Sequence, residues 1–204
     1  MKECLLCETR LTASLSWKSL LGMDKQALIC TKCLGQFQRI NIKENTGFSQ
    51  VASLYSYNEA MRNYLHQFKF LQDVALAGVF ANELRRYLPK EATIVPIPMH
   101  PEKLAARTFA HVDEVLKYAD IPFVHLLEKT GTESMGEKSK KERLAMDPLF
   151  KLRQHSTINP NAFYILIDDI YTTGTTLRHA VTVLKEAGAK RIEAVTLIRA
   201  KRQL

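Results

Sequence analysis

Two adjacent carboxylates, Asp168 and Asp169, stand between an apolar run at residues 163–167 and a turn rich in hydroxyl groups. The turn occupies residues 172–176 and reads Thr-Thr-Gly-Thr-Thr. Beyond it, apolar residues recur at the spacing of a helix until Gly188, a residue type that commonly ends helices. The pattern predicts a buried strand, a loop and a helix, with the carboxylates where the strand ends.

A loop that joins a strand to a helix in an α/β protein lies at the carboxyl edge of the sheet, where free N–H groups of the helix favour an anion. Gly174 allows a tight turn close to a ligand, and the threonine hydroxyls add donors, so a phosphate is the expected occupant. Asp168 and Asp169 would repel a phosphate, so we expect them to bind a neighbouring ribose diol, or a diol shared with a divalent cation. The alternative is that these acids only end a strand and that the threonines only cap the helix.

Neither of the two common phosphate-binding loops, G-x-x-x-x-G-K-[ST] and G-x-G-x-x-G after a strand, occurs in this chain, which removes the main support for an ATPase or a dinucleotide-binding enzyme. The segment 163–177 instead resembles the fingerprint of the type I phosphoribosyltransferases, an apolar run followed by D-D-x-x-T-T-G-x-T. That family binds 5-phosphoribosyl 1-pyrophosphate (PRPP). The resemblance implies that Asp168 and Asp169 hold the ribose during catalysis and that the 5′-phosphate is bound by Thr172, Thr173, Gly174, Thr175 and Thr176.

All four cysteines lie near the start of the chain as two C-x-x-C pairs, Cys4 with Cys7 and Cys30 with Cys33. Paired knuckles can supply four thiolates to one tetrahedral Zn²⁺, and because four ligands leave no open position the zinc is expected to be structural. A redox role usually needs one C-x-x-C beside a βαβ pattern, and disulfides are disfavoured in the cytoplasm. A segment this short buries little apolar surface, so the metal would replace a core.

The composition is that of a globular protein, with 204 residues of which 46% are hydrophobic and 25% charged. No apolar run approaches the length of a membrane span and no basic-then-apolar leader is present, so we expect a soluble, cytoplasmic protein without membrane insertion. The formal net charge of +8 is compatible with polyanionic partners, although a generally basic surface explains it as well.

Strand and helix patterns alternate along the chain and predict an α/β fold, with a mostly parallel sheet of the type I phosphoribosyltransferase kind and a small N-terminal zinc ribbon. We expect the zinc ribbon over residues 1–45, a polar linker over 43–50 and a phosphoribosyltransferase-like domain over 51–204. The expected strands are 51–57, 92–99, 121–127, 163–167 and 192–198, and the expected helices are 59–70, 74–88, 101–119 and 177–187.

Two cations one helical turn apart, Lys103 and Arg107, follow the expected strand 92–99 and could bind the pyrophosphate end of a ligand with phosphate at both ends. A solvated helix face explains the same spacing. Residues 131–143 contain four cations and two glycines, and they are expected to form either a mobile lid over a phosphorylated substrate or a solvated excursion. The six histidines are scattered without metal-ligand spacing, and none is assigned a catalytic role.

A four-cysteine ribbon joined to such a domain resembles the ComF family of late-competence proteins. The likeness includes H-Q-F-K-F at residues 66–70 and V-P-I-P-x-H-P at 95–101, and it implies that Lys69, an ordinary surface lysine by its spacing, takes part in PRPP binding. The family's R-G-F-N-Q appears here as Arg-Thr-Phe-Ala-His at residues 107–111. Its glutamine-bearing stretch is replaced by residues 133–141, although Glu142 and Arg143 match the E-R that follows. These departures concern the contacts to the acceptor.

Two functions follow from these resemblances. The first is a phosphoribosyltransferase, in which a nitrogen nucleophile displaces pyrophosphate from C1 of PRPP with the assistance of Mg²⁺. Relatives in purine salvage have an aspartate general base where Thr172 stands, so the base here would come from the 131–143 segment or from the acceptor itself. The second is a non-catalytic module that binds single-stranded DNA during DNA uptake in natural transformation, beside an ATP-dependent DNA translocase. The basic C-terminal residues support this second function, and the lack of an evident row of aromatic residues counts against it.

Overall fold

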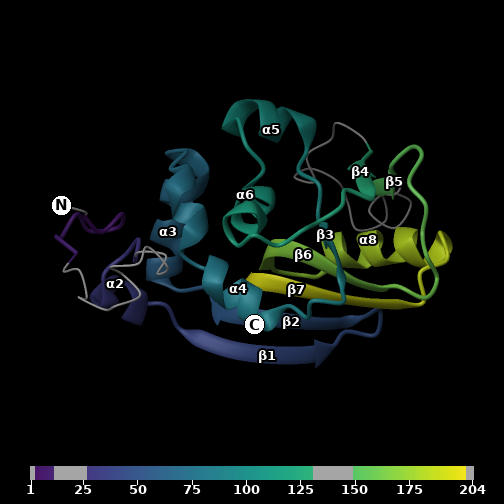
Figure 1. The fold of residues 1–204 in the computed structure, drawn as a ribbon, viewed down its shortest axis with the longest axis horizontal. Coiled ribbons are helices and arrows are strands. Elements are labelled where there is room, and N and C mark those ends of the chain that lie inside the picture. Colours follow the sequence, from purple (N-terminus) through teal and green to yellow (C-terminus); the bar gives the residue numbers. More distant parts are fainter. Residues whose placement is uncertain (1–2, 12–26, 131–148, 201–204) are drawn as a thin grey trace.

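The structure, a computed structural model, describes residues 3–11, 27–130 and 149–200. Its centre is a five-stranded sheet in the order β1-β2-β7-β6-β3, in which β1 and β2 are antiparallel and the other neighbours are parallel (Figure 1). The strands are β1 (Arg39–Asn45), β2 (Gln50–Ser56), β3 (Thr93–Pro96), β6 (Phe163–Tyr171) and β7 (Arg191–Arg199). The expected α/β fold with a mostly parallel sheet is therefore confirmed.

Helices and a small second sheet cover the central sheet. The first core lies between the sheet and the helices α2 (Thr31–Gly35), α3 (Glu59–Phe70), η1 (Val74–Gly78, a 3₁₀ helix), α4 (Ala81–Tyr87) and α6 (His111–Tyr118), which α5 (Pro101–Arg107) precedes. The second core lies on the other face, under α8 (Thr175–Glu186), β4 (Leu127–Lys129) and β5 (Phe150–Leu152). Ile165 and Ile167 of β6 enter the first core, whereas Tyr164 and Leu166 enter the second. A strand buried on both faces belongs at the centre of a parallel sheet, which explains the unbroken apolar run.

The helix α3 presents an apolar side to the first core and ends near the carboxyl edge of the sheet. Asn58 caps its first turn by accepting a hydrogen bond from the N–H of Met61 at 2.9 Å. Met61, Tyr64 and Phe68 recur at helical spacing and are buried. Lys69, in the last turn, is consequently held beside the core, with its side chain only 13% exposed.

The cysteine-bearing segment packs against the same core as α3. Cys4, Cys33 and Phe37 are buried together with Tyr64 and Phe80. The ring of Phe37 lies edge-on to both aromatic rings, 5.1 Å from that of Phe80 and 6.0 Å from that of Tyr64 between centroids. This segment therefore shares its apolar packing with the rest of the chain.

Two expected helices are each broken into two shorter ones. The helix expected over 74–88 divides into η1 and α4, and the break follows Gly78, where a Cβ would lie 2.4 Å from the ring of Tyr118. The helix expected over 101–119 divides into α5 and α6 because Thr108 adopts a left-handed conformation with φ of 64°. The sequence periodicity continues across both breaks, so periodicity alone did not reveal them.

Two expectations about strands and linkers were wrong. The strand expected over 121–127 is not formed apart from its last residue, which begins β4. Val124 donates one backbone hydrogen bond to β3 at 2.9 Å, but Pro122 has no N–H with which to continue a ladder. The linker expected over 43–50 is a β-hairpin, in which β1 and β2 pair across a turn containing Gly47 with φ of 80°.

Among the helices that the structure describes, the longest are α3 and α8, with 12 residues each. Within the described ranges, no helix combines the length and the apolar character that crossing a lipid bilayer requires.

Candidate functional site

The acid pair lies within β6 rather than after it, because the strand continues to Tyr171. Oδ1 of Asp168 accepts a hydrogen bond from the N–H of Asp169 at 2.9 Å, and Oδ2 of Asp169 forms an ion pair with Nζ of Lys69. One oxygen of each acid is thus held by a protein group. A carboxylate has about four acceptor positions, so each acid retains capacity for the hydroxyl groups of a ligand.

The two acids differ in their ionisation. Burial, followed by the neighbouring charge of Asp169, raises the pKa of Asp168 to about 7. Burial also acts to raise the pKa of Asp169, but the ammonium of Lys69 outweighs it and holds that pKa below its ordinary value. At neutral pH Asp169 is therefore ionised, while Asp168 is divided between its protonated and ionised forms. The position of Lys69 decides which of the two acids carries the charge.

Lys69 reaches the acid pair from α3, 100 residues earlier in the sequence. Its spacing along the helix is that of an ordinary surface lysine, and only the H-Q-F-K-F resemblance marked it. Together with Asp168, Asp169 and His111 it lines a cavity of about 10 Å³, which is about the space of a single water molecule. The structure therefore brings Lys69 to the acid pair.

The capping residue of α8 offers no side chain to the first turn of the helix, and the side-chain contact found there is the N–H of Thr175 donating to the hydroxyl of Thr173 at 3.5 Å. The capping residue is Gly174, which adopts a left-handed conformation with φ of 78° and has no side chain to accept an N–H. The hydroxyls of Thr173 and Thr175 lie 3.0 Å apart, Thr172 and Thr173 are exposed, and Thr176 is partly exposed. The first turn of a 12-residue helix therefore offers N–H groups and hydroxyls together, an arrangement suited to a phosphate.

The two cations of α5 have different surroundings. Burial and the charge of Lys103 lower the pKa of Lys129 in β4, against the opposing effect of Asp168. Arg107 instead lies over the ring of Phe70, 5.2 Å from its centroid. Lys103 therefore lies near enough to Lys129 to act on its charge, whereas Arg107 lies against the end of α3. No spacing rule had marked Lys129.

His111 is a buried residue of this region to which the sequence assigned no role. It is 2% exposed, and its ring packs edge-on against Phe68 and Phe109, with centroids 5.3 Å away in both cases. Among the described residues its Nε2 has no hydrogen-bond partner. Burial lowers the pKa of His111 to about 4, with Lys69 acting in the same direction and Asp169 against it. Its place at the end of the R-G-F-N-Q counterpart was the one signal that could have indicated it.

Several sequence predictions fall outside the described ranges. They are the lid or solvated excursion at 131–143, the replaced stretch 133–141, the matching residues Glu142 and Arg143, and the last residues of the basic C-terminus.

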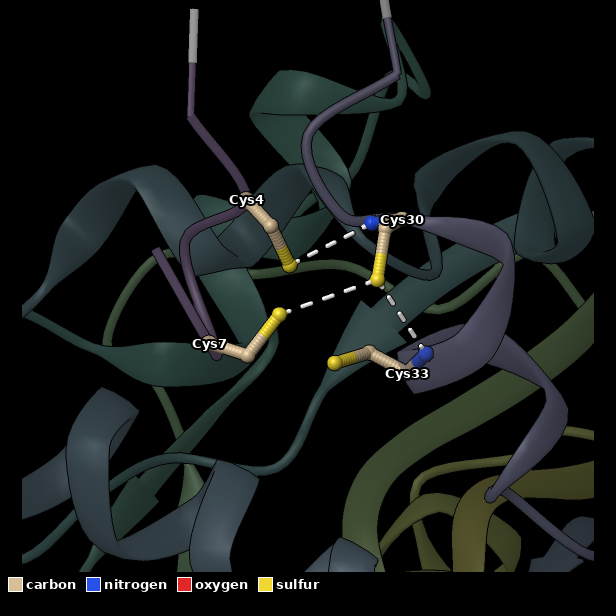
Figure 2. Close-up of side chains that lie close together, drawn as sticks. All are labelled: Cys4, Cys7, Cys30 and Cys33. Atoms are coloured by element: carbon tan, nitrogen blue, oxygen red, sulfur yellow. Dashed lines mark hydrogen bonds between the residues drawn. The ribbon is translucent and has the colours of Figure 1, made fainter. Parts of the chain in front are cut away.

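The four cysteines come together in space, and Figure 2 shows their side chains around a common centre. Their sulfur atoms all lie within 4.8 Å of one another, the sulfurs of Cys7 and Cys30 are 3.7 Å apart, and no disulfide joins them. A tetrahedral zinc with Zn–S bonds of about 2.3 Å separates its sulfurs by about 3.8 Å, so the set fits the metal. The N–H groups of Cys30 and Cys33 donate to the sulfurs of Cys4 and Cys30 at 3.3 and 3.4 Å, which favours thiolates. The cluster can therefore hold a metal ion.

Comparison with known proteins adds a family to this geometry. The model of the phosphoribosyl transferase domain matches residues 62–204. Competence protein ComFC of Streptococcus pneumoniae (strain ATCC BAA-255 / R6) is 32% identical over 224 residues, which cover 97% of this chain and all of that protein. Competence protein ComFC of Bacillus subtilis (strain 168) is 28% identical over 228 residues, which cover 96% of this chain and 94% of that protein.

Solved structures show a weaker likeness. A hypoxanthine phosphoribosyltransferase from Staphylococcus aureus matches 72% of this chain and 78% of its own, with 16% sequence identity and a TM-score of 0.40.

Proposed function

Because this chain belongs to the phosphoribosyl transferase domain family and to the ComF family of competence proteins, we propose that it binds PRPP or a related ribose phosphate, together with Mg²⁺. The ribose would lie against Asp168 and Asp169, and the 5′-phosphate would lie in the turn 172–176. Since the two relatives that match nearly the whole chain are competence proteins, this binding would serve DNA uptake in natural transformation.

The observation that carries this proposal is the placement of the acid pair and the uncapped start of α8 at the end of a single strand. Carboxylates accept hydrogen bonds from a diol, whereas the N–H groups of a helix N-terminus bind a phosphate. Cations stand on both flanks, with Lys69 toward α3 and with Lys103 and Lys129 toward β4. A sugar with a diol between two phosphorylated ends matches this order of groups.

In the reaction that we propose, a nitrogen nucleophile forms a bond to C1 of the ribose while the bond from C1 to pyrophosphate breaks, and pyrophosphate leaves with the electron pair. The nitrogen then releases a proton, which Thr172 cannot accept at neutral pH, so another group must act as the base. Lys103 and Lys129 would stabilise the charge of the departing pyrophosphate. The oxygens of Asp168 and of the pyrophosphate are of the type that Mg²⁺ prefers, and the ion would supply further positive charge against the leaving group.

We also propose that the metal of the cysteine cluster is zinc and that its role is structural, because thiolates fill all four coordination positions. The division of the chain into a zinc ribbon at residues 1–45 and a phosphoribosyltransferase-like domain at 51–204 stays a prediction. The two parts are joined closely, since β1 belongs to the central sheet and Phe37 to the shared core.

Isothermal titration calorimetry with PRPP and Mg²⁺ tests the binding. We expect the double variant Asp168→Asn, Asp169→Asn to lose at least about 100-fold in affinity, since hydrogen bonds to charged groups contribute roughly 1.5–3 kcal/mol each. Asp120→Asn is the matched control, because it alters an exposed acid that pairs with Arg85 away from the site, and it should bind as the wild type does. Equal affinity in the double variant and the wild type would remove the proposal.

Release of pyrophosphate separates catalysis from binding. An enzyme should release pyrophosphate from PRPP when a suitable nitrogen nucleophile is added, and the double variant should not. PRPP binding without release across ammonia, purine and pyrimidine bases would favour a regulatory ligand site over a transferase.

A groove beside the cysteine-bearing segment supports a second candidate function, the binding of single-stranded DNA. It has a volume of about 710 Å³. Its walls combine apolar side chains and the acid Glu83, which pairs with Arg39, with cations, amides and aromatic rings from Arg39, Asn41, Asn82, Arg86, Tyr87 and Tyr118. Tyr118 is 36% exposed, and Nζ of Lys43 lies 5.6 Å from the ring centroid of Tyr87. Aromatic platforms next to cations are the usual means of binding single strands, and here they come from separate elements, so the sequence showed no aromatic row.

A mobility-shift series with single-stranded DNA at increasing salt tests this second function. We expect Arg86→Gln to weaken binding and to reduce the slope against salt by about one, as the loss of one phosphate contact does. Tyr87→Ala should weaken binding with an unchanged slope, and Arg62→Gln, on an exposed face of α3, is the control. A flat salt dependence would exclude phosphate-driven binding. An ATP-dependent DNA translocase remains a proposed partner that rests on the competence family alone.

A further inference from the structure

Two arginine–aromatic pairs stand at opposite ends of the neighbouring strands β6 and β7. Parallel pairing places Phe163 opposite Arg191 at the amino ends and Tyr171 opposite Arg199 at the carboxyl ends. In each pair the guanidinium lies over the ring, 3.8 Å from the centroid for Arg191 and 4.6 Å for Arg199. The pairs are chemically alike, but only the second lies next to the turn proposed to bind the phosphate.

Tyr171 packs against the backbone of that turn. It is the last residue of β6 and is 5% exposed. A Cβ on Gly174 would lie 2.6 Å from the hydroxyl oxygen of Tyr171 and 2.9 Å from its ring, so the tyrosine packs directly against the glycine backbone. The tyrosine therefore limits where Gly174, the capping residue of α8, can lie. Two features require glycine at this position, its left-handed conformation and the lack of space for a Cβ.

Arg199 holds Tyr171 in place. Its guanidinium pairs with Glu44 of β1, and its side chain is 17% exposed. The N–H of Ala200 donates to the carbonyl of Tyr171 at 2.9 Å, which joins the two strand ends. Within the described residues, Nη1 of Arg199 is buried and has no hydrogen-bond partner. The guanidinium therefore contacts both the ring of Tyr171 and Glu44, whose carboxylate balances its charge.

We infer that Tyr171 and Arg199 are positioning residues of the phosphate turn, in which the tyrosine fixes the backbone at Gly174 and the arginine holds the tyrosine ring in place. The inference rests on the proposed function, because it concerns the same turn. It goes beyond that function because the motif D-D-x-x-T-T-G-x-T leaves the position of Tyr171 unspecified and does not extend to Arg199.

Titrations followed by ³¹P NMR test the inference with two probes, inorganic phosphate and ribose 5-phosphate. Inorganic phosphate has no diol for the acid pair, whereas ribose 5-phosphate can contact both the turn and the acid pair. We expect Arg199→Met and Tyr171→Leu to weaken both probes by about tenfold, the lower end of the loss seen when supporting partners are removed at metal sites. Arg199→Lys keeps the charge and Tyr171→Phe keeps the ring, so each should recover part of the affinity.

The control is Arg191→Met, which removes the equivalent pair at the other end of the same strands. It should leave the affinity for both probes within about twofold of the wild type, even if it lowers the melting temperature as much as Arg199→Met does. If the wild type binds the probes and Arg199→Met and Tyr171→Leu bind them equally well, the inference is overturned and the proposed function stands. If the wild type binds neither probe, the proposed function fails and the inference fails with it.

Discussion

Lys69 of α3 forms an ion pair with Asp169 of β6 across 100 positions of the sequence, and the two side chains are only 13% and 21% exposed. Because solvent screens a pair in this position weakly, the lysine determines how the neighbouring acids ionise. Asp169 keeps its charge, while burial and that neighbouring charge raise the pKa of Asp168 to about 7. The proposed ribose site therefore presents one constant carboxylate and one that titrates near neutral pH.

Replacing Lys69 should weaken ligand binding in a pH-dependent way. In Lys69→Met the pKa of Asp169 loses its main lowering influence and should rise, so a smaller fraction of this acid is ionised at pH 7 and the affinity for PRPP should fall by about tenfold or more. Affinity should recover as the pH rises and both acids ionise. Calorimetry between pH 6 and pH 9 measures this, with Lys69→Arg expected to retain binding. Lys117→Met, at an exposed ion pair on α6, is the control, and a Lys69→Met variant with the wild-type pH profile would contradict the argument.

His111 and Asp168 should give opposite pH dependences of stability between about pH 4 and pH 7. The pKa of His111 lies near 4 in the folded protein, below its ordinary 6.5, so the unfolded chain binds more protons and the free energy of unfolding rises with pH. The pKa of Asp168 lies near 7, above its ordinary 3.8, so its contribution to that free energy falls as the pH rises. The two effects offset each other in the wild type.

Single variants should separate these two effects. Urea denaturation at pH 4.5, 5.5 and 6.5 should show a free energy of unfolding that falls with pH relative to the wild type in His111→Gln, and one that rises relative to it in Asp168→Asn. Glutamine is chosen because it stands at this position in the ComF pattern. Parallel curves for the two variants would mean that the assigned titrations are wrong.

Removal of the metal should destabilise more than the cysteine-bearing segment. Cys4 and Cys33 are buried in the same core as Phe37 and Tyr64, so loosening the cluster exposes apolar surface of the main core. We expect one zinc per chain by elemental analysis, and a lower melting temperature after treatment with a chelator or in Cys33→Ser. Thr9→Ala, next to the cluster but not a ligand, should keep the metal. A protein without metal that melts as the untreated one does would rule out a structural zinc.

Two glycines with nearly the same backbone conformation allow a matched comparison. Gly174 and Gly47 have φ of 78° and 80°. A Cβ added at Gly174 would meet the hydroxyl of Tyr171, whereas a Cβ added at Gly47 would meet no atom within 4 Å. Gly47→Ala should cost roughly 1–2 kcal/mol for the left-handed conformation alone. Gly174→Ala should cost more than this and should also reduce phosphate affinity. Urea denaturation and ³¹P titration measure both quantities, and equal costs at the two sites would show that Tyr171 does not constrain the turn.

Local patterns predicted the elements whose residues are contiguous. The helix expected over 59–70 has these bounds in the structure, because a capping asparagine and a regular apolar stripe are both local signals. The strand expected over 163–167 was correct but short, since β6 continues through the acid pair. Failures occurred where a single backbone conformation overrode the periodicity, as at Thr108, or where polar residues formed an edge hairpin at 43–50.

By itself the sequence determined the order of strand, acid pair, turn and helix, and it determined the set of four cysteines, because residue type and short spacing are enough to specify them. The tertiary structure alone decided that Lys69 meets Asp169, that Arg199 covers Tyr171 and that His111 is buried without a partner for Nε2 among the described residues. These neighbours come from different elements, and their separation depends on how helices and strands pack rather than on their distance along the chain. Charge and burial then act through those separations, and so the ionisation of the acid pair follows from the fold and not from the motif.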